Sequence, residues 1–433
     1  MMRGARGGAG ARHAAPPALR AALAALCILL AAPSLAEPPP RTVVLLLYDG
    51  FAPALLDAQP TPAFHRIERE GAYTRHFEPV FPSISLINQV TISTGCWPEH
   101  HGIVTNVFLD SERGRYDHDG DADWLLGCEH LHHAAQRQGL RSAALWFVGA
   151  HSKKNGDQAD LVSPDLPFDR RPPDAERMAE VIRLLGLPAA ERPRLISAYL
   201  NGPDDAEHFR GMDSQETADA VVESDALLGR LMAAIDAHPD REQIAVVVTT
   251  DHGMREVSTL VNIRRILLSH EIAATPVSTG TTSFLYFEKD DPAAVERAAA
   301  ALAAYPEFEV LRRGAFPDYV RLGTSSRVPP LIVSAKPPYF IEDTDRWPSW
   351  LQWLGDWGPE FVYARFGLKA THGYPPDTEG MHGILYAWGS GVARGRDLGP
   401  VRAIDVHPTV ARLVGMQPGR PVDGAPIEAL LAR

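Results

Sequence analysis

The sequence predicts a doubly wound α/β fold, in which helices cover both faces of a mostly parallel sheet. Two features predict it: continuous apolar runs of strand length, and helix-like patterns between several of these runs. A strand that is buried on both faces has an unbroken apolar run, and strands that alternate with helices are typical of parallel sheets. With 433 residues, of which 45% are hydrophobic, the chain can form a large core.

The first expected strand is Val43–Tyr48, which opens the predicted domain. Runs of the same kind are expected as strands at Ala143–Val148, Leu195–Leu200, Ile244–Thr250, Ser283–Phe287 and Ile384–Trp388. The clearest helix is expected at Asp219–His238, where apolar residues recur at helical spacing and lead directly into the run at Ile244.

Residues 42–433 are expected to form a single domain. Within it, residues 255–370 are more irregular and contain the proline pairs Pro329-Pro330 and Pro337-Pro338. We expect this stretch to be a smaller insertion or cap that packs on the same core, rather than an independent domain.

The N-terminal segment has the pattern of an export signal. Arginines precede the apolar run Ala21–Ala32, and Ser34-Leu35-Ala36 places small residues where signal peptidase inspects them. We expect a signal peptide at residues 1–36, a proline-rich linker at 37–41, and an exported protein, periplasmic or secreted. The alternative is an uncleaved anchor helix. The run is shorter than the ~20 residues that span a bilayer, so no stable membrane anchor is expected.

Charge and cysteine content limit the partners and leave one covalent question open. The net charge is −12, whereas proteins that bind nucleic acid in a groove usually carry a positive charge, so such a partner is not expected. The mature chain would contain Cys96 and Cys128. An oxidising compartment permits a bridge between them, and two buried free thiols are the alternative. The oligomeric state is not predicted.

Polar residues suited to metal binding or acid–base chemistry follow three of the expected strands. In chain order they are Asp49, Asp204, His208, Asp251 and His252. Ligands in open α/β sheets bind beyond the carboxyl ends of the strands, so these residues are candidates for a site. Simpler interpretations exist: Asp49-Gly50 can be a turn, and Asp204 with His208 can be a helix cap and a surface residue. Asp251-His252 is the stronger signal, because burying both side chains without a partner is costly.

In combination, these motifs resemble the nucleotide pyrophosphatase/phosphodiesterase family of the alkaline phosphatase superfamily. The matching segments, in the family's order and at similar spacing, are Leu47–Gly50, Pro79–Asn106, Gly202–His208, Thr249–Met254 and Thr371–Tyr374. The segment from Asp405 to Gly415 also resembles the helix that closes the family's catalytic domain. The resemblance implies an alkaline phosphatase-like fold and one metal-dependent phosphodiesterase domain over residues 42–433.

The resemblance further implies two divalent metal ions, usually zinc. One ion would be held by Asp204, His208 and His372. The other would be held by Asp49, Asp251, His252 and the oxygen of the nucleophile, Ser85. These residue types suit zinc with a position left for substrate, and manganese or iron would also tolerate them. The negative charge of the chain is compatible with a small phosphorylated substrate, a nucleotide or another phosphodiester, held by such ions.

Ser85 matches the family's nucleophile, in a register set by Thr94-Gly95 and by Pro98–Ile103. Most phosphodiesterase members have Thr there, and other members of the superfamily have Ser. Either hydroxyl serves, because coordination to a dication lowers its pKa. Ser83 is the competing position, and a polar loop start is the simpler interpretation of both serines. Asn106 matches an Asn that donates to a phosphoryl oxygen; it can also be a turn residue.

Three departures from the family pattern are visible. Leu86 occupies a position where nucleotide-cleaving members have an aromatic residue that stacks on the base, so base recognition would need another aromatic; the candidates are Phe108, Trp124 and Trp146. His101 and His382 lie outside the motif positions and are interpreted as structural. Cys96 follows Thr94-Gly95 rather than preceding it, which excludes a sulfatase register.

The implied reaction is an in-line displacement at phosphorus through a covalent phospho-serine. The leading expectation is therefore a two-metal hydrolase of phosphodiester or pyrophosphate bonds. A phosphomonoesterase or phosphonate hydrolase on the same scaffold is the nearby alternative. A non-catalytic exported metal-binding protein is the alternative from a different class.

Overall fold

The structure is a computed structural model that describes residues 41–118, 122–152, 158–167, 170–288, 291–341, 353, 355–363 and 367–432. Residues 41–433 form one compact unit. The expected signal peptide at residues 1–36 lies outside the described residues, as does the linker except for Arg41. Among the described helices, none is both long and apolar enough to cross a bilayer.

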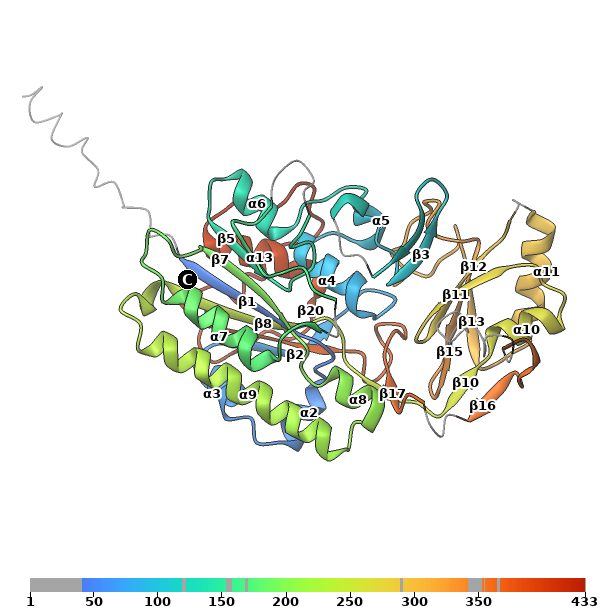
Figure 1. Ribbon diagram of the computed structural model, residues 1–433, viewed down its shortest axis with the longest axis horizontal. Helices are drawn as coiled ribbons and strands as arrows, with labels where there is room; N and C mark the ends of the chain where they lie inside the picture. Colours follow the sequence, from blue (N-terminus) through green and yellow to red (C-terminus); the bar gives the residue numbers. More distant parts are fainter. Residues whose placement is uncertain are drawn as a thin grey trace, which may run out of the picture. The chain divides into compact units, whose positions relative to one another are not determined.

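A nine-stranded sheet forms the centre of this unit (Figure 1). Its order is β19-β2-β18-β8-β1-β7-β5-β6, and β20 also pairs with β2. The strands are β1 (Thr42–Tyr48), β2 (Ala72–Glu78), β5 (Ser142–Leu145), β6 (Leu161–Val162), β7 (Leu195–Leu200), β8 (Ile244–Thr250), β18 (Gly383–Gly389), β19 (Arg396–Asp397) and β20 (Val401–Arg402). All pairs are parallel except those of β18, which runs antiparallel to both β8 and β2. The mostly parallel sheet is as predicted.

Helices pack on both faces of this sheet (Figure 1). One face carries α2 (Pro53–Ala58), α3 (Pro62–Glu70), α7 (Asp174–Leu185) and α9 (Gln215–Asp236). The other carries α4 (Ser85–Thr94), α6 (Leu131–Arg137) and α13 (Val406–Val414). Alternate residues of β1 belong to two different core clusters: Val43 and Leu45 to one, Val44 and Leu46 to the other. The run is unbroken because both sides of the strand are buried, which confirms the reasoning from the sequence.

Three strand predictions are confirmed and three need correction. The runs at residues 43–48, 195–200 and 244–250 are β1, β7 and β8. The run at 143–148 is a strand only to Leu145, and Trp146 has a positive φ of 51°, which extended backbone does not allow. The run at 384–388 lies in the central sheet, but in its antiparallel strand. The run at 283–287 lies outside the central sheet, in a small antiparallel one.

The predicted helix at Asp219–His238 is α9, which begins earlier than expected. Its first residue is Gln215, because the Ser214 hydroxyl accepts a hydrogen bond from the Thr217 amide at 3.1 Å and so caps the helix. The helix ends at Asp236. The closing helix expected from the resemblance is α13, which ends at Gly415 with a positive φ of 84°.

Two further sheets lie within residues 255–370. One joins β10 (Thr259–Val261), β15 (Tyr339–Ile341) and β16 (Phe361–Tyr363); the other joins β11 (Thr275–Thr279), β12 (Thr282–Tyr286), β14 (Leu331–Ala335) and β13 (Phe308–Arg312). With α10 (Ile263–Ser269) and α11 (Pro292–Leu302) they enclose their own core cluster. Phe284 and Ile332 also join the cluster on the α4 face of the central sheet. The boundaries of the insertion remain a prediction.

The remaining described elements are short. They are α5 (Pro98–His101), α8 (Asp204–Arg210), the hairpin of β3 (Val107–Asp110) and β4 (Gly114–Asp117), the pair of β9 (Arg255–Glu256) and β17 (Ala370–Thr371), and three 3₁₀ turns at Ala122–Trp124, Arg241–Gln243 and Ala403–Asp405. A disulfide joins Cys96 to Cys128, which answers the question that the sequence left open. It closes a segment that contains Asn106.

Candidate active site

The carboxyl ends of three neighbouring parallel strands carry the acidic residues of the site. Asp49 directly follows β1, Asp251 directly follows β8, and Asp204 begins α8 shortly after β7. The ends of these strands are level, because Tyr48 pairs with both Leu200 and Thr250. Side chains that are far apart in the sequence therefore meet at one edge of the sheet.

Close packing of the turns brings the carboxylates together. Gly50 has a φ of +68°, and a Cβ placed on it would lie 2.9 Å from the Cβ of Asp204. Gly202 has a φ of +57°, and a Cβ there would lie 2.7 Å from the Asp49 carbonyl oxygen. Only glycine combines this conformation with this lack of volume, so the two turns can touch.

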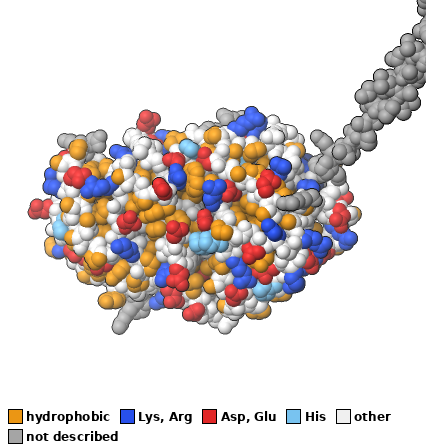
Figure 2. Space-filling view, turned by 180° about the vertical axis from the view of Figure 1, so that it is seen from behind, with side chains coloured by type: hydrophobic (Ala, Val, Ile, Leu, Met, Phe, Trp, Pro, Cys, Tyr) orange, Lys and Arg blue, Asp and Glu red, His pale blue; other side chains and the backbone are white. Residues whose placement is uncertain are grey.

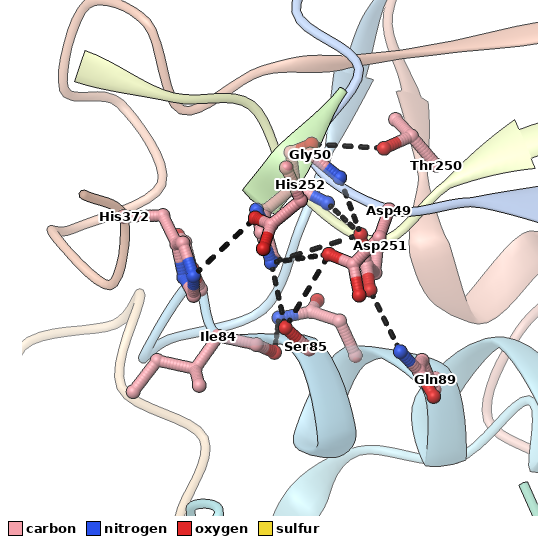
Figure 3. A network of polar contacts seen from close by, with 12 residues as sticks. Asp49, Gly50, Ile84, Ser85, Gln89, Thr250, Asp251, His252 and His372 are labelled. Carbon is pink, nitrogen blue, oxygen red and sulfur yellow. Dashed lines mark hydrogen bonds and ion pairs between the residues drawn. The ribbon is translucent and has the colours of Figure 1, made fainter. Parts of the chain in front are cut away.

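Ser85 is the first residue of α4, and its hydroxyl points at the acidic cluster (Figure 3). Its Oγ lies 3.0 Å from His252 Nε2 and donates to Asp49 Oδ1 at 3.4 Å. The N-cap residue of α4 is Ile84, whose side chain makes no cap hydrogen bond, and the positive end of the helix dipole lies at Ser85, where it favours an anion. The competing Ser83 is fully buried and donates to the Tyr374 carbonyl at 2.8 Å, outside this cluster.

The other two histidines come from α8 and from the loop after β17. His208 lies one turn along α8 from Asp204. His372 follows β17, which pairs with β9 just after His252, and this pairing returns the chain to the site. The rings of His252 and His372 stack with centroids 3.6 Å apart.

Backbone carbonyls fix the proton position on all three imidazoles. The contacts are His208 Nδ1 to Ala370 O at 2.8 Å, His252 Nδ1 to Gly253 O at 2.9 Å, and His372 Nδ1 to Ser83 O at 3.0 Å. A carbonyl oxygen only accepts, so the proton of each neutral ring is on Nδ1 and the Nε2 lone pair is directed into the site. Histidines that bind metals are held in this way.

The site has the composition and charge of an ion-binding site. His208 Nε2 and His372 Nε2 lie 3.1 Å apart, although neither carries a proton to share. Oδ1 of Asp204 is buried and has no hydrogen-bond partner among the described residues. The pKa of Asp49 is well above its ordinary value because the carboxyl is desolvated and because Asp251 and Asp204 are near. A cation would relieve all three features.

Two overlapping groups of side chains could each hold an ion. Asp204, His208 and His372 form one, and Asp49, Asp204 and His252 form the other; within each group the donor atoms lie within 4.8 Å of one another. Asp251 Oδ1 lies 3.7 Å from His252 Nε2, at the edge of the second group. The residues present therefore fit the divalent ions expected from the sequence, and Asp204 belongs to both groups.

Two residues that the sequence analysis did not single out hold the carboxylates. The Tyr199 hydroxyl donates to Asp49 Oδ2 at 2.5 Å, and the Gln89 amide donates to Asp251 Oδ2 at 2.9 Å (Figure 3 shows the latter). Asp251 is fully buried. Tyr199 lies in an apolar strand and Gln89 within a helix, so only their position beside the strand ends could have identified them.

Asn106 lies next to the N-terminus of α4. Its Oδ1 accepts a hydrogen bond from the Leu86 amide at 3.0 Å, so its amide NH₂ group remains free to donate to a ligand at Ser85. This is the orientation that a phosphoryl-oxygen donor requires. His101, interpreted as structural, is fully buried: its Nε2 lies 3.0 Å from the Thr91 hydroxyl, and its Nδ1 accepts from the Ile103 amide.

Comparison with known proteins identifies the family. Residues 43–384 match the family model of the type I phosphodiesterases/nucleotide pyrophosphatases. The chain belongs to this family.

Curated relatives agree with this assignment. A venom phosphodiesterase of Crotalus durissus collilineatus is 29% identical over 228 residues, which are 50% of this chain and 26% of the relative. An ectonucleotide pyrophosphatase/phosphodiesterase of Caenorhabditis elegans is 28% identical over 361 residues, which are 80% of this chain and 43% of the relative. The chain thus spans less than half of the length of these two relatives.

A solved structure shows the same fold. An inactive variant of murine ectonucleotide pyrophosphatase/phosphodiesterase 5, in complex with AMP, superposes with a TM-score of 0.78 at 22% identity. The match covers 90% of this chain and 100% of the murine chain. The alkaline phosphatase-like α/β fold expected from the sequence is therefore confirmed.

Two of the three aromatic residues suggested as substitutes for Leu86 are buried in the core. Phe108 and Trp124 pack with Tyr116 in the core, with the Phe108 and Tyr116 ring centroids 4.5 Å apart. Trp146 packs against the core cluster on the opposite face of the sheet. Phe108 and Trp124 serve as core, so the suggestion was wrong for them, and it stays a prediction for the partly buried Trp146.

His382, like His101, was interpreted as structural. It is half-buried, and its ring lies tilted against that of His76 with centroids 3.9 Å apart. Its Nε2 is buried and has no hydrogen-bond partner among the described residues, so the structural role of His382 stays a prediction.

Proposed function

We propose that this family member is a metal-dependent hydrolase of phosphodiester or pyrophosphate bonds in small phosphorylated substrates such as nucleotides, and that Ser85 is its nucleophile. The observation that carries the proposal is the convergence of the Ser85 hydroxyl with His252 Nε2 at 3.0 Å and Asp49 Oδ1 at 3.4 Å. Family membership supports the reaction class.

We assign the metal ligands as the sequence suggested: Asp204, His208 and His372 for one ion, and Asp49, Asp251, His252 and Ser85 Oγ for the other. Zinc is the ion we propose first, because imidazole and carboxylate donors suit it. When bound, two such ions would supply charge stabilisation for the entering and leaving oxygens. The three Nδ1 contacts to backbone carbonyls keep the histidines in the ligating tautomer.

In the first step, Ser85 Oγ forms a bond to phosphorus while the bond from phosphorus to the leaving-group oxygen breaks. The Asp49 carboxylate is the acceptor within reach of the hydroxyl proton, since its Oδ1 already accepts from Ser85 Oγ at 3.4 Å, whereas the Nε2 lone pair of His252 is assigned to the ion. The amide NH₂ group of Asn106 is placed to donate to the phosphoryl oxygens, and the positive end of the α4 dipole favours their negative charge. The product of this step is a phospho-serine at Ser85.

In the second step, a water oxygen forms the new bond to phosphorus and Ser85 Oγ leaves and recovers a proton. The phosphate or phosphomonoester product carries the water oxygen. Microscopic reversibility makes the same groups serve both steps, with the proton moving in the opposite direction.

We also propose that the protein is exported and acts on soluble small molecules. The export-signal pattern and the disulfide between Cys96 and Cys128 support an oxidising compartment, and the names of relatives refer to venom and ecto-enzymes. The AMP complex of the murine neighbour supports a nucleotide as substrate. Figure 2 shows Lys and Arg side chains intermixed with Asp and Glu on the face drawn, rather than gathered in a basic groove.

The test compares hydrolysis of a bis-aryl phosphate and a mono-aryl phosphate by the zinc-loaded chain and by Ser85→Ala. We expect preference for the diester in the parent chain, and loss of turnover in Ser85→Ala with the fold and bound metal retained. Preference for the monoester would favour the phosphomonoesterase alternative. Normal turnover in Ser85→Ala would refute the nucleophile. Less than one bound ion in the intact protein would favour a non-catalytic binding protein.

A further inference from the structure

A charged pair at the start of α7 holds the turn between β7 and α8. The carboxylate of Asp174 accepts hydrogen bonds from two successive backbone amides of this turn, Asn201 N at 3.0 Å and Gly202 N at 3.1 Å. The guanidinium of Arg177 donates to the Asn201 side-chain oxygen at 3.0 Å and to the Tyr199 carbonyl at 3.4 Å. Residues at the start of α7 thus hold both the backbone and the Asn201 side chain of the turn.

This pair is buried, which is costly for two charged groups. The Arg177 side chain is 1% exposed and the Asp174 side chain 15%, and their charged atoms lie 3.5 Å apart. Burial lowers the pKa of Arg177 and raises the pKa of Asp174, so the environment opposes both charges. A buried ion pair is weak evidence for stability, since apolar residues of similar volume often stabilise as well or better. Its contacts instead indicate what it does: one hydrogen bond, from Arg177 Nε to the Pro172 carbonyl at 2.7 Å, stays next to α7, and the other four go to residues 199–202.

The turn leads to two of the proposed metal ligands. Asp204 follows Gly202 by two residues and begins α8. Tyr199, whose carbonyl Arg177 binds, donates its hydroxyl to Asp49 Oδ2 at 2.5 Å. The amide of Asp49 itself donates to the Leu200 carbonyl at 3.1 Å. Movement of the turn would therefore displace Asp204 directly and Asp49 through Tyr199.

The two ligands need to be held, because like charges in one site repel each other. Asp49 and Asp204 both lie in the buried cluster, and the glycines of their turns are in contact distance of the opposite turn. Without an ion, repulsion between the carboxylates would favour separation of the turns. Contacts from outside the site that fix the backbone would keep the ligands at their binding distance before an ion arrives.

We propose that Asp174 and Arg177 are positioning residues that hold Asp204 and Asp49 in place for metal binding. The inference rests on the proposed function, since it assumes that the cluster binds divalent ions. Neither residue touches the cluster; both act through the turn at residues 199–202.

The chain offers a matched control in Asp225. This carboxylate on α9 is also buried, also has a raised pKa caused by burial, and also accepts from two successive backbone amides, Ala63 at 2.9 Å and Phe64 at 3.0 Å. Those amides begin α3, which carries none of the proposed ligands. Asp225→Asn therefore removes the same kind of contact from the fold without loosening the ligand turn.

The experiment measures zinc retention by the full chain against a competing chelator, for the parent chain, Asp174→Asn, Arg177→Lys and Asp225→Asn. We expect Asp174→Asn to retain zinc about 10-fold less tightly, the lower end of the range for groups that orient metal ligands, and Asp225→Asn to match the parent. Arg177→Lys should also retain zinc less tightly than the parent chain. The lysine ammonium lies one bond closer to the main chain than Nη1, and it cannot replace both Nη1, which makes the two contacts to the turn, and Nε, which donates to the Pro172 carbonyl at 2.7 Å. Thermal unfolding of each variant reports the purely structural loss.

The outcomes separate the inference from the function on which it rests. Equal zinc retention in Asp174→Asn and Asp225→Asn, with zinc and diesterase activity present in the parent, overturns the positioning role alone. A parent chain that binds no zinc overturns the proposed function and this inference with it. If Asp174→Asn does not fold, Arg177→Lys decides the comparison by the same criterion.

Discussion

Acid should unfold this protein steeply, because several of its histidines are buried in a neutral form. His101, His130, His132 and His407 are fully buried. Desolvation lowers the pKa of His101 to about 3 and that of His407 to about 4; it also lowers the pKa of His130 and His132 well below 6.5, to which the neighbouring imidazoles contribute. Between pH 6.5 and these lowered pKa values, the unfolded chain binds protons at these positions and the folded chain does not.

The magnitude follows from linkage. For a histidine whose folded-state pKa is depressed, stability is present above the unfolded pKa and is lost as the pH falls below it. Between pH 7 and pH 5, a histidine with an unfolded pKa of 6.5 loses about 2 kcal/mol if it stays neutral when folded. Four such residues would remove about 8 kcal/mol, which is comparable with the whole stability of a typical domain. The raised pKa of Asp49 acts in the opposite direction, so a single variant is the sharper test.

The variant His407→Gln tests how much one buried histidine contributes to the pH dependence of stability. Its Nδ1 lies 2.7 Å from the Ser93 carbonyl and its Nε2 accepts from the Gly419 amide, so the substitution is destabilising at pH 7. The deficit relative to the parent should shrink by about 2 kcal/mol between pH 7 and pH 5. Urea unfolding followed by circular dichroism at pH 7, 6 and 5 measures it, with His270→Gln, at an exposed histidine, as control. A deficit that stays constant over this range would refute the reasoning.

Three further predictions concern the disulfide, a buried ion pair and the bound metal. Cys128→Ser opens a bridge between residues 32 apart and should lower the free energy of unfolding by about 4 kcal/mol, measured by denaturant titration with and without reductant. Arg327→Met leaves the Asp110 carboxylate buried without the cation that lies 2.7 Å from it, and should lower the free energy of unfolding by about 3–5 kcal/mol. We also expect a lower kcat, because Asp110 ends β3, which directly follows Asn106; kcat should not fall further in an Asn106→Ala background. Removal of metal by chelation should lower the thermal midpoint, and added zinc should restore it in proportion to its concentration, as calorimetry would show.

The strands that are buried on both faces were the part of the fold best predicted from the sequence. The run at Val43–Tyr48 is apolar throughout because one half of its side chains packs under α4 and the other half under α3 and α9. The same logic cannot give strand direction, so β18 was recognised as a strand but its antiparallel pairing was not expected. The search for apolar runs also missed β2. Arg75 and His76 interrupt the apolar pattern there, because that strand is only partly buried.

The site was predictable where chemistry and topology coincide. Asp49 and the Asp251-His252 pair stand at the ends of neighbouring parallel strands, so the sheet itself brings them together. His372 needed the resemblance, because a lone loop histidine has no local pattern and reaches the site only through the pairing of β17 with β9. Tyr199 could not be identified from an apolar strand, since its hydroxyl contact with Asp49 depends on which face of the sheet it occupies.

Residues 255–370 take part in the site in a way that their irregular sequence did not indicate. Loop residues on either side of Asn106 are tied to them: the Thr105 and Thr279 hydroxyls lie 2.8 Å apart, and the Leu109 amide donates to the Tyr286 hydroxyl at 3.2 Å. The disulfide closes the same loop from the other direction. The amide that we propose as phosphoryl donor is therefore held by Thr279 and Tyr286, whereas the three carboxylates follow strands of the central sheet. Residues 255–370 also reach two metal ligands, because Ala370 accepts from His208 and the pairing of β17 with β9 positions His372. Changes at Thr279 or Tyr286, which contact the loop of Asn106, should accordingly alter turnover more than metal retention.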